Sequence, residues 1–371
     1  MSRARTFADL ATASEEGSLS NRNMIINGNF LVDQRKSGGT HTGLGTYYID
    51  RWQMIDSGNL DDMAIEVSQN DDIPDGIGDG KSFKYQLKTV ESALAADEQV
   101  AIAQTIEAQN LARLNYGTSS AKSATLSFYV KSSLTGTFAV SMYQEDGDDI
   151  IGSTYTINSA DTWERKTITF SGNTSQAFTL DNGVGLVIRW QLWTGSNFTG
   201  TTNTSWGSYA AAKLANGHTQ NGLGSSDEST WQLAFVQFEV GEVATSFEHE
   251  SFGDTLARCQ RYFYKFLSTD VYGALGATGM QINTNSSSGV MFQGTHPVMM
   301  RAAPTMAVGG SWSVEAATGG STFSLATGVR TNIYTWQSQE AIPTSNSSDG
   351  AAAMSYASND NDAFLSGSAE L

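Results

Sequence analysis

The stretch ATLSFYVKSS, residues 124–133, alternates strictly between apolar and polar positions. One face carries Leu126, Phe128 and Val130, and the other carries Ser127, Tyr129 and Lys131. Successive side chains of a β-strand point to opposite faces of a sheet, so the pattern predicts a strand with one buried face. The next segment, GTFAVSMYQ (136–144), repeats the pattern with Phe138, Val140 and Met142. Two adjacent strands of this kind are typical of an antiparallel sheet.

The same alternation recurs between residues 23 and 250. Strands are predicted in YYIDRWQMI (47–55), SFKYQLKTV (82–90), QVAIAQTIEA (99–108), WERKTITF (163–170), GVGLVIRWQLW (183–193) and WQLAFVQFEV (231–240). NMIINGNFLVDQR (23–35) reads as a strand, an Asn-Gly turn and a second strand, and QNLARL (109–114) reads as a short helical turn. In 183–193 the period places Trp190 in the core and both Arg189 and Trp193 on the opposite face. The spacing predicts an antiparallel sandwich or jelly roll over residues 23–250.

The composition also favours an all-β protein. Charged residues make up only 16% of the 371 residues, with 37 Gly and 4 Pro, and Ser, Thr and Asn are abundant. Such a composition is typical of β-rich proteins of the extracellular type rather than of helical cytosolic enzymes. The length predicts two or three domains.

Charge and cysteine content exclude several classes of partner and site. The net charge is -17, from 21 basic and 38 acidic residues, so nucleic acid is not expected as a partner. No segment approaches the roughly 18 apolar residues of a membrane span, so no membrane insertion is expected. The N-terminus lacks the apolar core of a secretory signal, which predicts synthesis in the host cytoplasm. The single cysteine, Cys259, excludes an internal disulfide and a cysteine-built zinc site.

The two ends of the chain indicate assembly with other chains. Residues 1–22 are expected to contain a short amphipathic helix in which Phe7 and Leu10 share one face. A helix this short is unstable alone, so the segment is expected to attach the chain to a larger assembly through these two side chains. Residues 268–371 are rich in Gly, Ser, Thr and Asn and predict a smaller β domain with few apolar residues. Both features favour an oligomer, with a homotrimer preferred.

Residues 251–267 are expected to form a helix that connects the two β domains. Ser251 is a plausible N-cap, with Asp254 three residues later in a capping-box-like pattern. One face of this helix would carry Phe252, Leu256, Cys259, Phe263 and Phe266. Cys259 is therefore read as a small buried apolar residue. Glu248, His249 and Glu250 could form a catalytic cluster with Cys259, but no second histidine lies nearby in the sequence, and a structural role is favoured.

The strands and the connecting segment resemble a known module. The segments carrying the similarity are NMIINGNFLVDQR, YYIDRWQ, ATLSFYVKSSLTGTF, TWERKTITFSGNT, DNGVGLVIRWQLWTGSNF and VQFEVGEVATSFEHESFGDTLARCQRYF, followed by HPVMMRAAPT. Over about residues 21–305 they resemble a module of bacteriophage tail fibres and other virion appendages. The resemblance implies a jelly roll like that of carbohydrate-binding modules and a location on the virion.

Two ligand sites are predicted in the jelly roll. Aromatic rings stack on sugar rings, and Trp193, Trp206 and Tyr209 lie in or beside a polar loop that could bind glycan or pack at a subunit interface. NDDIPDGIGDGK supplies four acids close together that could hold a structural Ca²⁺, namely Asp71, Asp72, Asp75 and Asp79. The spacing is not that of an EF-hand, and no other cofactor is expected. No catalytic motif is readable, so no catalytic residue is assigned.

These observations favour a non-enzymatic virion structural protein, a tail fibre subunit involved in host attachment. Expected partners are copies of itself, other virion proteins contacted through the N-terminus, and a host surface glycan. A carbohydrate-binding receptor protein and a capsid decoration or head-fibre protein are alternatives. A glycan-cleaving tailspike is less favoured, because the sequence lacks the repeated rungs of a solenoid.

Overall fold

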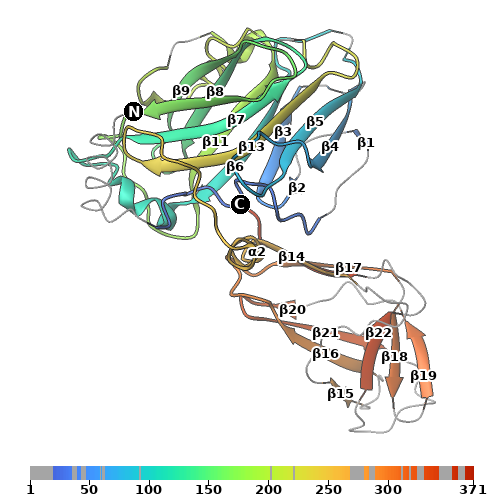
Figure 1. Cartoon of the computed structure of the whole chain (residues 1–371). Coiled ribbons are helices and arrows are strands. Elements are labelled where there is room, and N and C mark those ends of the chain that lie inside the picture. The colour runs from blue at the N-terminus through green and yellow to red at the C-terminus, as the bar shows by residue number, and fades with distance from the viewer. Residues whose placement is uncertain are drawn as a thin grey trace. The chain divides into compact units, whose positions relative to one another are not determined.

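The computed structural model describes most of the larger domain and the strands of the smaller one (Figure 1). The described residues are 20–35, 40–42, 47–58, 60, 63–91, 93–200, 203–219, 222–267, 280–283, 289–310, 312–316, 319–323, 330–341, 353–357 and 364–371. The chain divides into two compact units, Met1–Thr255 with Leu371, and Leu256–Glu370. Phe7 and Leu10, the residues predicted to attach the chain to the virion, lie outside the described residues.

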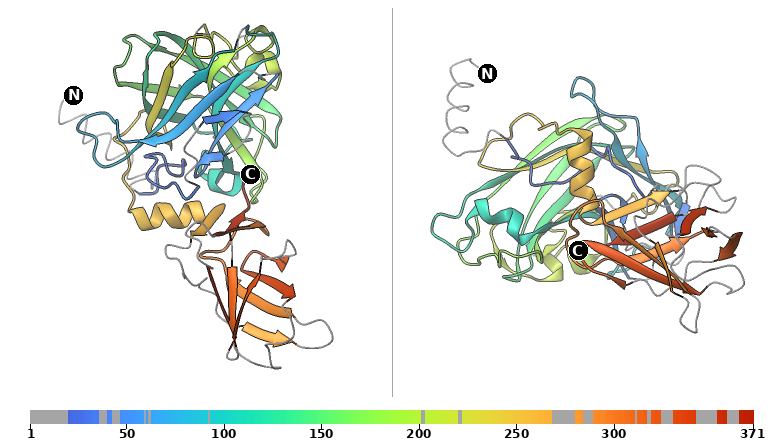
Figure 2. Two further views of the ribbon diagram at one scale, coloured as in Figure 1. Left: turned by 90° about the vertical axis from the view of Figure 1, so that its right-hand side faces the viewer. Right: turned by 90° about the horizontal axis from the view of Figure 1, so that it is seen from below.

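The larger unit is an antiparallel sandwich with a jelly-roll fold, as the strand pattern predicts (Figures 1 and 2). Its six-stranded sheet has the order β1 (Thr40–Thr42), β4 (Ala64–Asn70), β5 (Ser82–Thr89), β13 (Thr230–Val240), β7 (Ala124–Ser132) and β10 (Glu164–Phe170). Its seven-stranded sheet has the order β12 (Gly207–Ser208), β9 (Asp149–Ile157), β8 (Gly136–Gln144), β11 (Val184–Thr194), β6 (Gln99–Glu107), β3 (Trp52–Ser57) and β2 (Tyr47–Ile49). The 3₁₀ helices are η1 (Ala108–Leu114), η2 (Ser196–Phe198) and η3 (Ala211–Lys213).

The core lies between these two sheets and is rich in aromatic rings. Leu126, Phe128 and Val130 are fully buried, which confirms the predicted inner face of β7. The Phe128 ring meets Trp190 of the other sheet edge-on, with 5.8 Å between ring centroids. Edge-to-face contacts of this kind add to the hydrophobic gain of burial, so the sheets are joined by specific packing.

Four strands of the sandwich escape the sequence pattern, and one predicted hairpin is wrong. The alternation did not identify β1, β4, β9 or β12. Residues 23–35, predicted as strand, turn and strand, form no regular element, although Asn23–Phe30 is buried throughout. Asn27 and Phe30 adopt positive φ angles of 58° and 53°, which no strand permits. The side-chain oxygens of Asn23 and Asn27 accept hydrogen bonds from backbone amides of this segment, where a strand would have a neighbouring strand as partner.

The predicted connecting helix is shorter than expected. Helix α2 covers Phe252–Gln260, and Phe263–Leu267 is strand β14 rather than helix. Aromatic residues favour strands, and β14 gains a partner in β23 (Phe364–Ser368), whose position the local sequence does not reveal. The predicted cap is confirmed, because Ser251 Oγ accepts a hydrogen bond from the Asp254 amide at 3.2 Å and donates one to its carboxylate at 2.7 Å. Phe252, predicted on the apolar face, is exposed.

The smaller unit is also built of antiparallel strands. One three-stranded sheet has the order β14, β23, β17 (Thr305–Gly309). A four-stranded sheet has the order β15 (Met280–Asn283), β16 (Gly289–Thr295), β21 (Thr335–Ala341), β20 (Arg330–Thr331). A second three-stranded sheet has the order β19 (Gly319–Phe323), β18 (Trp312–Ala316), β22 (Ala353–Ala357). The chain is therefore all-β apart from short helices, as predicted. Within the described part, no helix is both long and apolar enough to cross a membrane.

Cys259 is fully buried on α2, as its place on the apolar face predicts. We expect Cys259→Ala to lower the free energy of unfolding by about 1 kcal/mol, because it leaves a small cavity and removes one polarisable atom. Urea titration of the variant and the parent protein measures the difference. In the native protein, the thiol should react with a maleimide only after unfolding, since burial disfavours the thiolate. Rapid labelling of the folded protein would contradict this structural role.

Candidate functional site

The structure does not bring the predicted glycan-binding aromatics together on one surface. Trp193 is only 1% exposed and belongs to the main core cluster, so its assignment to a glycan surface is wrong. Trp206 is partly buried, meets Tyr116 edge-on and donates its indole N–H to the Ser171 carbonyl at 2.6 Å. Tyr209 is 37% exposed and packs against Tyr143 with 4.9 Å between centroids. Of the three, only Tyr209 presents a substantial open face.

A register shift in β11 accounts for the burial of Trp193, because the pairing with β6 slips between Gln191 and Trp193 and sets Trp193 opposite the core residue Val100. The loop that follows β11 folds back over the outer face of β8 and β9, where Phe198, Leu214 and Ala215 pack on Ala139 and Ile150. At Gly224, a Cβ atom would lie 2.5 Å from the Trp193 ring, so the chain passes directly over the indole at a residue without a side chain. Alternation assigned Trp193 to the outer face, but the register shift turns its side chain into the core.

The four aspartates predicted to hold calcium do not converge. Asp71 pairs with Lys81, and Asp72 pairs with Lys131, whereas Asp75 and Asp79 are exposed. Among the residues that the structure describes, no group of three or more His, Cys, Asp or Glu side chains could hold a metal ion. Lysine ammonium groups already neutralise two of the four carboxylates. The acidic loop therefore does not fit a calcium site, and that prediction is wrong.

Asp72 instead organises polar groups on the outer face of the six-stranded sheet. Its carboxylate accepts hydrogen bonds from Lys131, from the Trp163 indole at 3.0 Å and from Gln232 at 3.2 Å. Partial burial by itself raises the pKa of Asp72, but these three donors outweigh it and lower the pKa below its usual value. The Lys131 ammonium also lies 5.5 Å from the centroid of the Trp163 ring. An aromatic side chain is thus fixed in place at this point of the sheet.

A groove of about 320 Å³ opens on the same outer face. It is lined by side chains from five separate parts of the chain, namely Gly76, Ile77, Ser127, Tyr129, Arg165, Phe235, Ser246, Phe247 and His249. Ser127 and Tyr129 are the polar-face residues of β7, so alternation in ATLSFYVKSS presents them here. Arg165 is paired with Tyr129 across β10 and β7. The sequence analysis did not identify this groove.

Phe235 reaches the groove because β13 is irregular. The register with β7 shifts between Ala234 and Gln237, and Phe235 has a positive φ of 49°. A bulge of this kind turns an extra side chain toward one face of a sheet. A left-handed phenylalanine costs about 1–2 kcal/mol, and the surrounding packing must offset that cost. Its ring meets both Tyr129 and Phe247 edge-on, at 6.3 and 5.2 Å between centroids.

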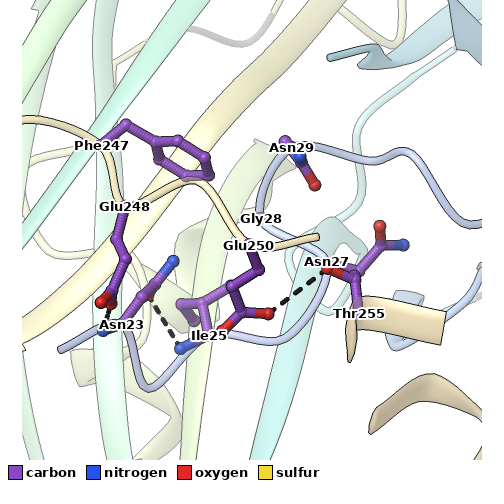
Figure 3. Close-up of a pocket in the computed structure, with 9 residues that line it drawn as sticks. All are labelled: Asn23, Ile25, Asn27, Gly28, Asn29, Phe247, Glu248, Glu250 and Thr255. Atoms are coloured by element: carbon purple, nitrogen blue, oxygen red, sulfur yellow. Dashed lines mark hydrogen bonds between the residues drawn. The ribbon is translucent and has the colours of Figure 1, made fainter. Parts of the chain in front are cut away.

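The segment after β13 forms one wall of the groove and has two different faces. Figure 3 shows Glu248 and Glu250 pointing to the same side, toward residues 23–29, whereas Phe247 points away from them. Glu248 accepts a hydrogen bond from the Asn23 amide at 2.8 Å, and Glu250 accepts one from Thr255 at 3.3 Å. These residues line a small polar pocket with room for about one water molecule. Glu248 and Glu250 therefore fix the backbone of this segment through hydrogen bonds, and Phe247 and His249 face the groove.

His249 joins this wall to the loop between β4 and β5. Its Nε2 lies 2.8 Å from the Ile77 carbonyl oxygen, and its ring packs edge-on against Phe247 at 5.1 Å. A Cβ atom at Gly78, where φ is 119°, would lie 2.9 Å from the imidazole. Only glycine fits such a position without strain. The cluster suggested by Glu248, His249, Glu250 and Cys259 is thus not formed, because His249 faces the groove, Glu248 and Glu250 point toward residues 23–29, and Cys259 is buried on α2.

A hydrogen bond to the loop after β13 orients Arg165. One terminal nitrogen donates to the Thr245 carbonyl at 2.7 Å. The nearby Glu239 carboxylate is buried and accepts bonds from the Gln237 amide and from the Thr245 amide and hydroxyl, at 2.7–2.8 Å. Glu239 therefore positions Thr245, and Thr245 positions the guanidinium.

The short connection from β9 of one sheet to β10 of the other carries Trp163 beside the groove, and Glu164 stabilises it. The carboxylate accepts bonds from the Asn158 and Ser159 amides at 2.7 and 2.9 Å and from Lys166 at 2.6 Å. Burial by itself raises the pKa of Glu164, but the bonds from Lys166, Ser159 and Asn158 outweigh it and hold the pKa at about 2. The folded-state pKa lies below the unfolded value of about 4.3, so the ionised carboxylate stabilises the fold.

We expect Glu164→Gln to lower the Tm by about 2–4 °C at pH 7. The difference from the parent protein should be complete above about pH 5 and should shrink as the pH falls toward 2, because protonation then removes the same interaction. Thermal unfolding across this pH range measures it, provided that both proteins stay folded at the acid end. Asp161→Asn changes an exposed acid of the same connection and serves as the control. A difference that stayed constant down to pH 3 would contradict the assignment.

The groove combines stacking surfaces with polar groups at their edges. Tyr129 and Phe247 are half-buried, so part of each ring remains open to a ligand. Arg165 and Ser246 are exposed and can donate hydrogen bonds. Aromatic faces with a few converging polar groups are typical of sites that bind small organic molecules, including sugars.

No protein-family model matches the chain, and no curated protein matches it. Similar solved structures exist. One is the enzymatically active domain of tailspike protein 4 of bacteriophage CBA120, with 13% identity and a TM-score of 0.33, covering 59% of this chain and 21% of that chain. The chain thus spans about a fifth of that tailspike chain.

Two further similar structures are single modules. A CBM4 structure shows 16% identity and a TM-score of 0.29, covering 58% of this chain and 98% of that chain. A putative sugar binding protein from Bacteroides thetaiotaomicron VPI-5482 shows 13% identity and a TM-score of 0.32, covering 59% of this chain and 100% of that chain.

Proposed function

We propose that the protein is a non-enzymatic structural subunit of a bacteriophage virion appendage, a tail fibre subunit, that binds a host surface glycan. The observation that carries the binding part is the groove on the six-stranded sheet, with its half-open Tyr129 and Phe247 rings. Its volume of about 320 Å³ lies at the lower end of the range of about 300–1,000 Å³ for ligand clefts. The virion location rests on the resemblance of residues 21–305 to tail fibre modules.

The groove is built to remain open in the free protein. Phe235 forms its buried floor, His249 joins two of its walls through Ile77, and Glu239 holds the loop that orients Arg165. A preformed site loses little conformational freedom when a ligand binds, which favours affinity for flexible oligosaccharides. The apolar faces of a pyranose ring can stack on Tyr129 and Phe247, while Ser246 and Arg165 reach its hydroxyl groups.

The proposal predicts that binding to host polysaccharide depends on these rings. Tyr129→Ala and Phe247→Ala should each weaken binding of purified host surface glycan by about tenfold or more, because each removes a stacking surface of about 1–2 kcal/mol. Isothermal titration calorimetry measures the affinity, and release of reducing ends from the same glycan tests for cleavage. Tyr209→Ala, which changes an exposed tyrosine on the other sheet, is the matched control. Unchanged affinity in both groove variants, or steady release of reducing ends, would contradict the proposal.

The location on the virion has its own test. Deletion of residues 1–20 should leave a folded oligomer, expected to be a trimer, that no longer joins particles. Ultracentrifugation of the truncated protein and quantification of its copies in purified virions measure the two effects. Incorporation at the normal copy number would exclude the N-terminal segment as the anchor.

A further inference from the structure

The Arg165 guanidinium lies in the groove lining, and no carboxylate of the described residues pairs with it. Lys81 and Lys131 are paired with Asp71 and Asp72. Arg165 is exposed, and the only hydrogen bond that it makes within the described part of the chain goes to the Thr245 carbonyl, at 2.7 Å. Glu239, the acid of β13 that holds Thr245, is buried and bonded to Gln237 and Thr245 instead.

The geometry leaves most of the binding capacity of Arg165 unused. A guanidinium group has five N–H donors in a planar fork, and a carbonyl bond at one terminal nitrogen leaves the remaining donors available. That fork matches the two oxygens of a carboxylate or the oxygens of a phosphate. Since Thr245 fixes one end of the group, little side-chain freedom remains to be lost on binding.

The aromatic surface and the cation are next to each other in the sheet. Arg165 and Tyr129 are directly paired across β10 and β7, and side chains so paired stand about 4.5–5.5 Å apart at their Cβ atoms. A sugar ring stacked on Tyr129 would therefore place a ring substituent within reach of the guanidinium. The substituent best suited to an unpaired cation is an oxyanion.

We propose that the groove selects an anionic sugar, whose carboxylate or phosphate is bound by Arg165 while its ring lies on Tyr129 and Phe247. The proposal rests on the glycan-binding function proposed above and names the chemical class of its ligand. The net charge of -17 repels anions at long range and so opposes the binding of such a sugar. Solvent-exposed charges farther than a Debye length of about 8 Å are largely screened at physiological salt. The attraction of an anion to the groove therefore depends mainly on the nearby Arg165 guanidinium.

The test compares three oligosaccharides that share one backbone and differ in one substituent. The probes are a neutral form, a form with a uronic acid and a form with a sugar phosphate. The parent protein should bind at least one anionic form about tenfold or more tightly than the neutral form, and added NaCl should reduce this preference. The preferred anionic form identifies the source of the oxyanion.

Variants separate the anion contact from general binding. Arg165→Gln should abolish the preference for the anionic form and leave the affinity for the neutral form within about twofold. Arg165→Lys should keep part of the preference, because it retains the charge and loses the fork. Lys84→Gln, which removes a cation from β5 of the same sheet outside the groove lining, should leave the preference unchanged. Asp75→Asn with Asp79→Asn, in the loop that supplies Gly76 and Ile77, should strengthen binding of the anionic form only.

The outcomes distinguish this inference from the function on which it rests. Equal affinity for all three probes, or equal losses in Arg165→Gln for neutral and anionic forms, overturns the anion assignment and leaves glycan binding intact. Failure of all three probes and of host polysaccharide to bind, with Tyr129→Ala indistinguishable from the parent, overturns the proposed function itself. If Arg165→Gln still prefers the anionic form, another cation binds the anion, and this result also overturns the inference.

Discussion

Replacement of Asn23 by alanine is expected to lower the free energy of unfolding of the larger unit by about 3–5 kcal/mol. The Asn23 side chain is buried and donates to the Val236 carbonyl at 3.0 Å. Its amide oxygen accepts from the backbone amides of Ile25 and Phe238, both at 3.0 Å. Alanine would leave these three backbone groups buried without their partner, and each such group costs about 1–3 kcal/mol.

The same substitution should also loosen the groove. Asn23 supports β13 next to its bulge, and its own amide donates to Glu248 in the segment that carries Phe247 and His249. A shift of the backbone at Asn23 would therefore move one wall of the groove. We expect weaker glycan binding by Asn23→Ala even at temperatures where the variant remains folded.

Urea titration and calorimetry measure the two effects of Asn23→Ala. Asn197→Ala is the matched control, because Asn197 is an exposed asparagine of the same unit and should change the free energy of unfolding by less than about 0.5 kcal/mol. A loss below about 1 kcal/mol in Asn23→Ala would show that water or backbone adjustment replaces the three bonds. The segment at residues 23–35 would then not depend on its asparagines.

Replacement of Trp193 by alanine should also be strongly destabilising, by about 3–5 kcal/mol. The indole is buried in the main core cluster and the chain at Gly224 lies directly against it, so its removal creates a large cavity that the surrounding core can only partly fill. A place for Trp193 on a glycan surface, which the sequence pattern predicts, would give the opposite result, namely normal stability with lost binding.

Stability and binding of Trp193→Ala therefore have to be measured together. The affinity per folded molecule should stay within about twofold of the parent, because the groove lies on the other sheet. Tyr209→Ala, which removes a partly exposed ring, should cost about 1 kcal/mol or less. Near-normal stability of Trp193→Ala would mean that the indole does not contribute to the core.

The local sequence predicted the strands of the sandwich well where one face is strictly apolar. In β7 the alternation placed Phe128 inside and Tyr129 outside, and both placements are confirmed. The helix cap at Ser251 was also predictable, because a cap depends on residues only three positions apart. Phe263–Leu267 was not, because its strand character depends on pairing with Phe364–Ser368 far along the chain.

The candidate site was not predictable, because its parts are distant in sequence. Its lining comes from residues 76–77, 127–129, 165, 235 and 246–249, which only the pairing of β7, β10 and β13 brings together. The one available signal was ATLSFYVKSS itself, whose polar face includes a tyrosine. The exposed acids of residues 71–79 were more conspicuous, but lysines that the sequence does not place beside them neutralise two of the four.

The sequence by itself determined that the chain is all-β, which residues of most strands face the core, and where α2 begins. These properties follow from the two-residue period of a strand and from local capping, which neighbouring residues control. Only the tertiary structure decided which outer face stays open. A loop covers the outer face of β8 and β9 on one sheet, whereas a bulge turns Phe235 into a groove on the other. Alternation distinguishes the inside of a sheet from its outside, but exposure of the outside depends on what the rest of the chain packs against it.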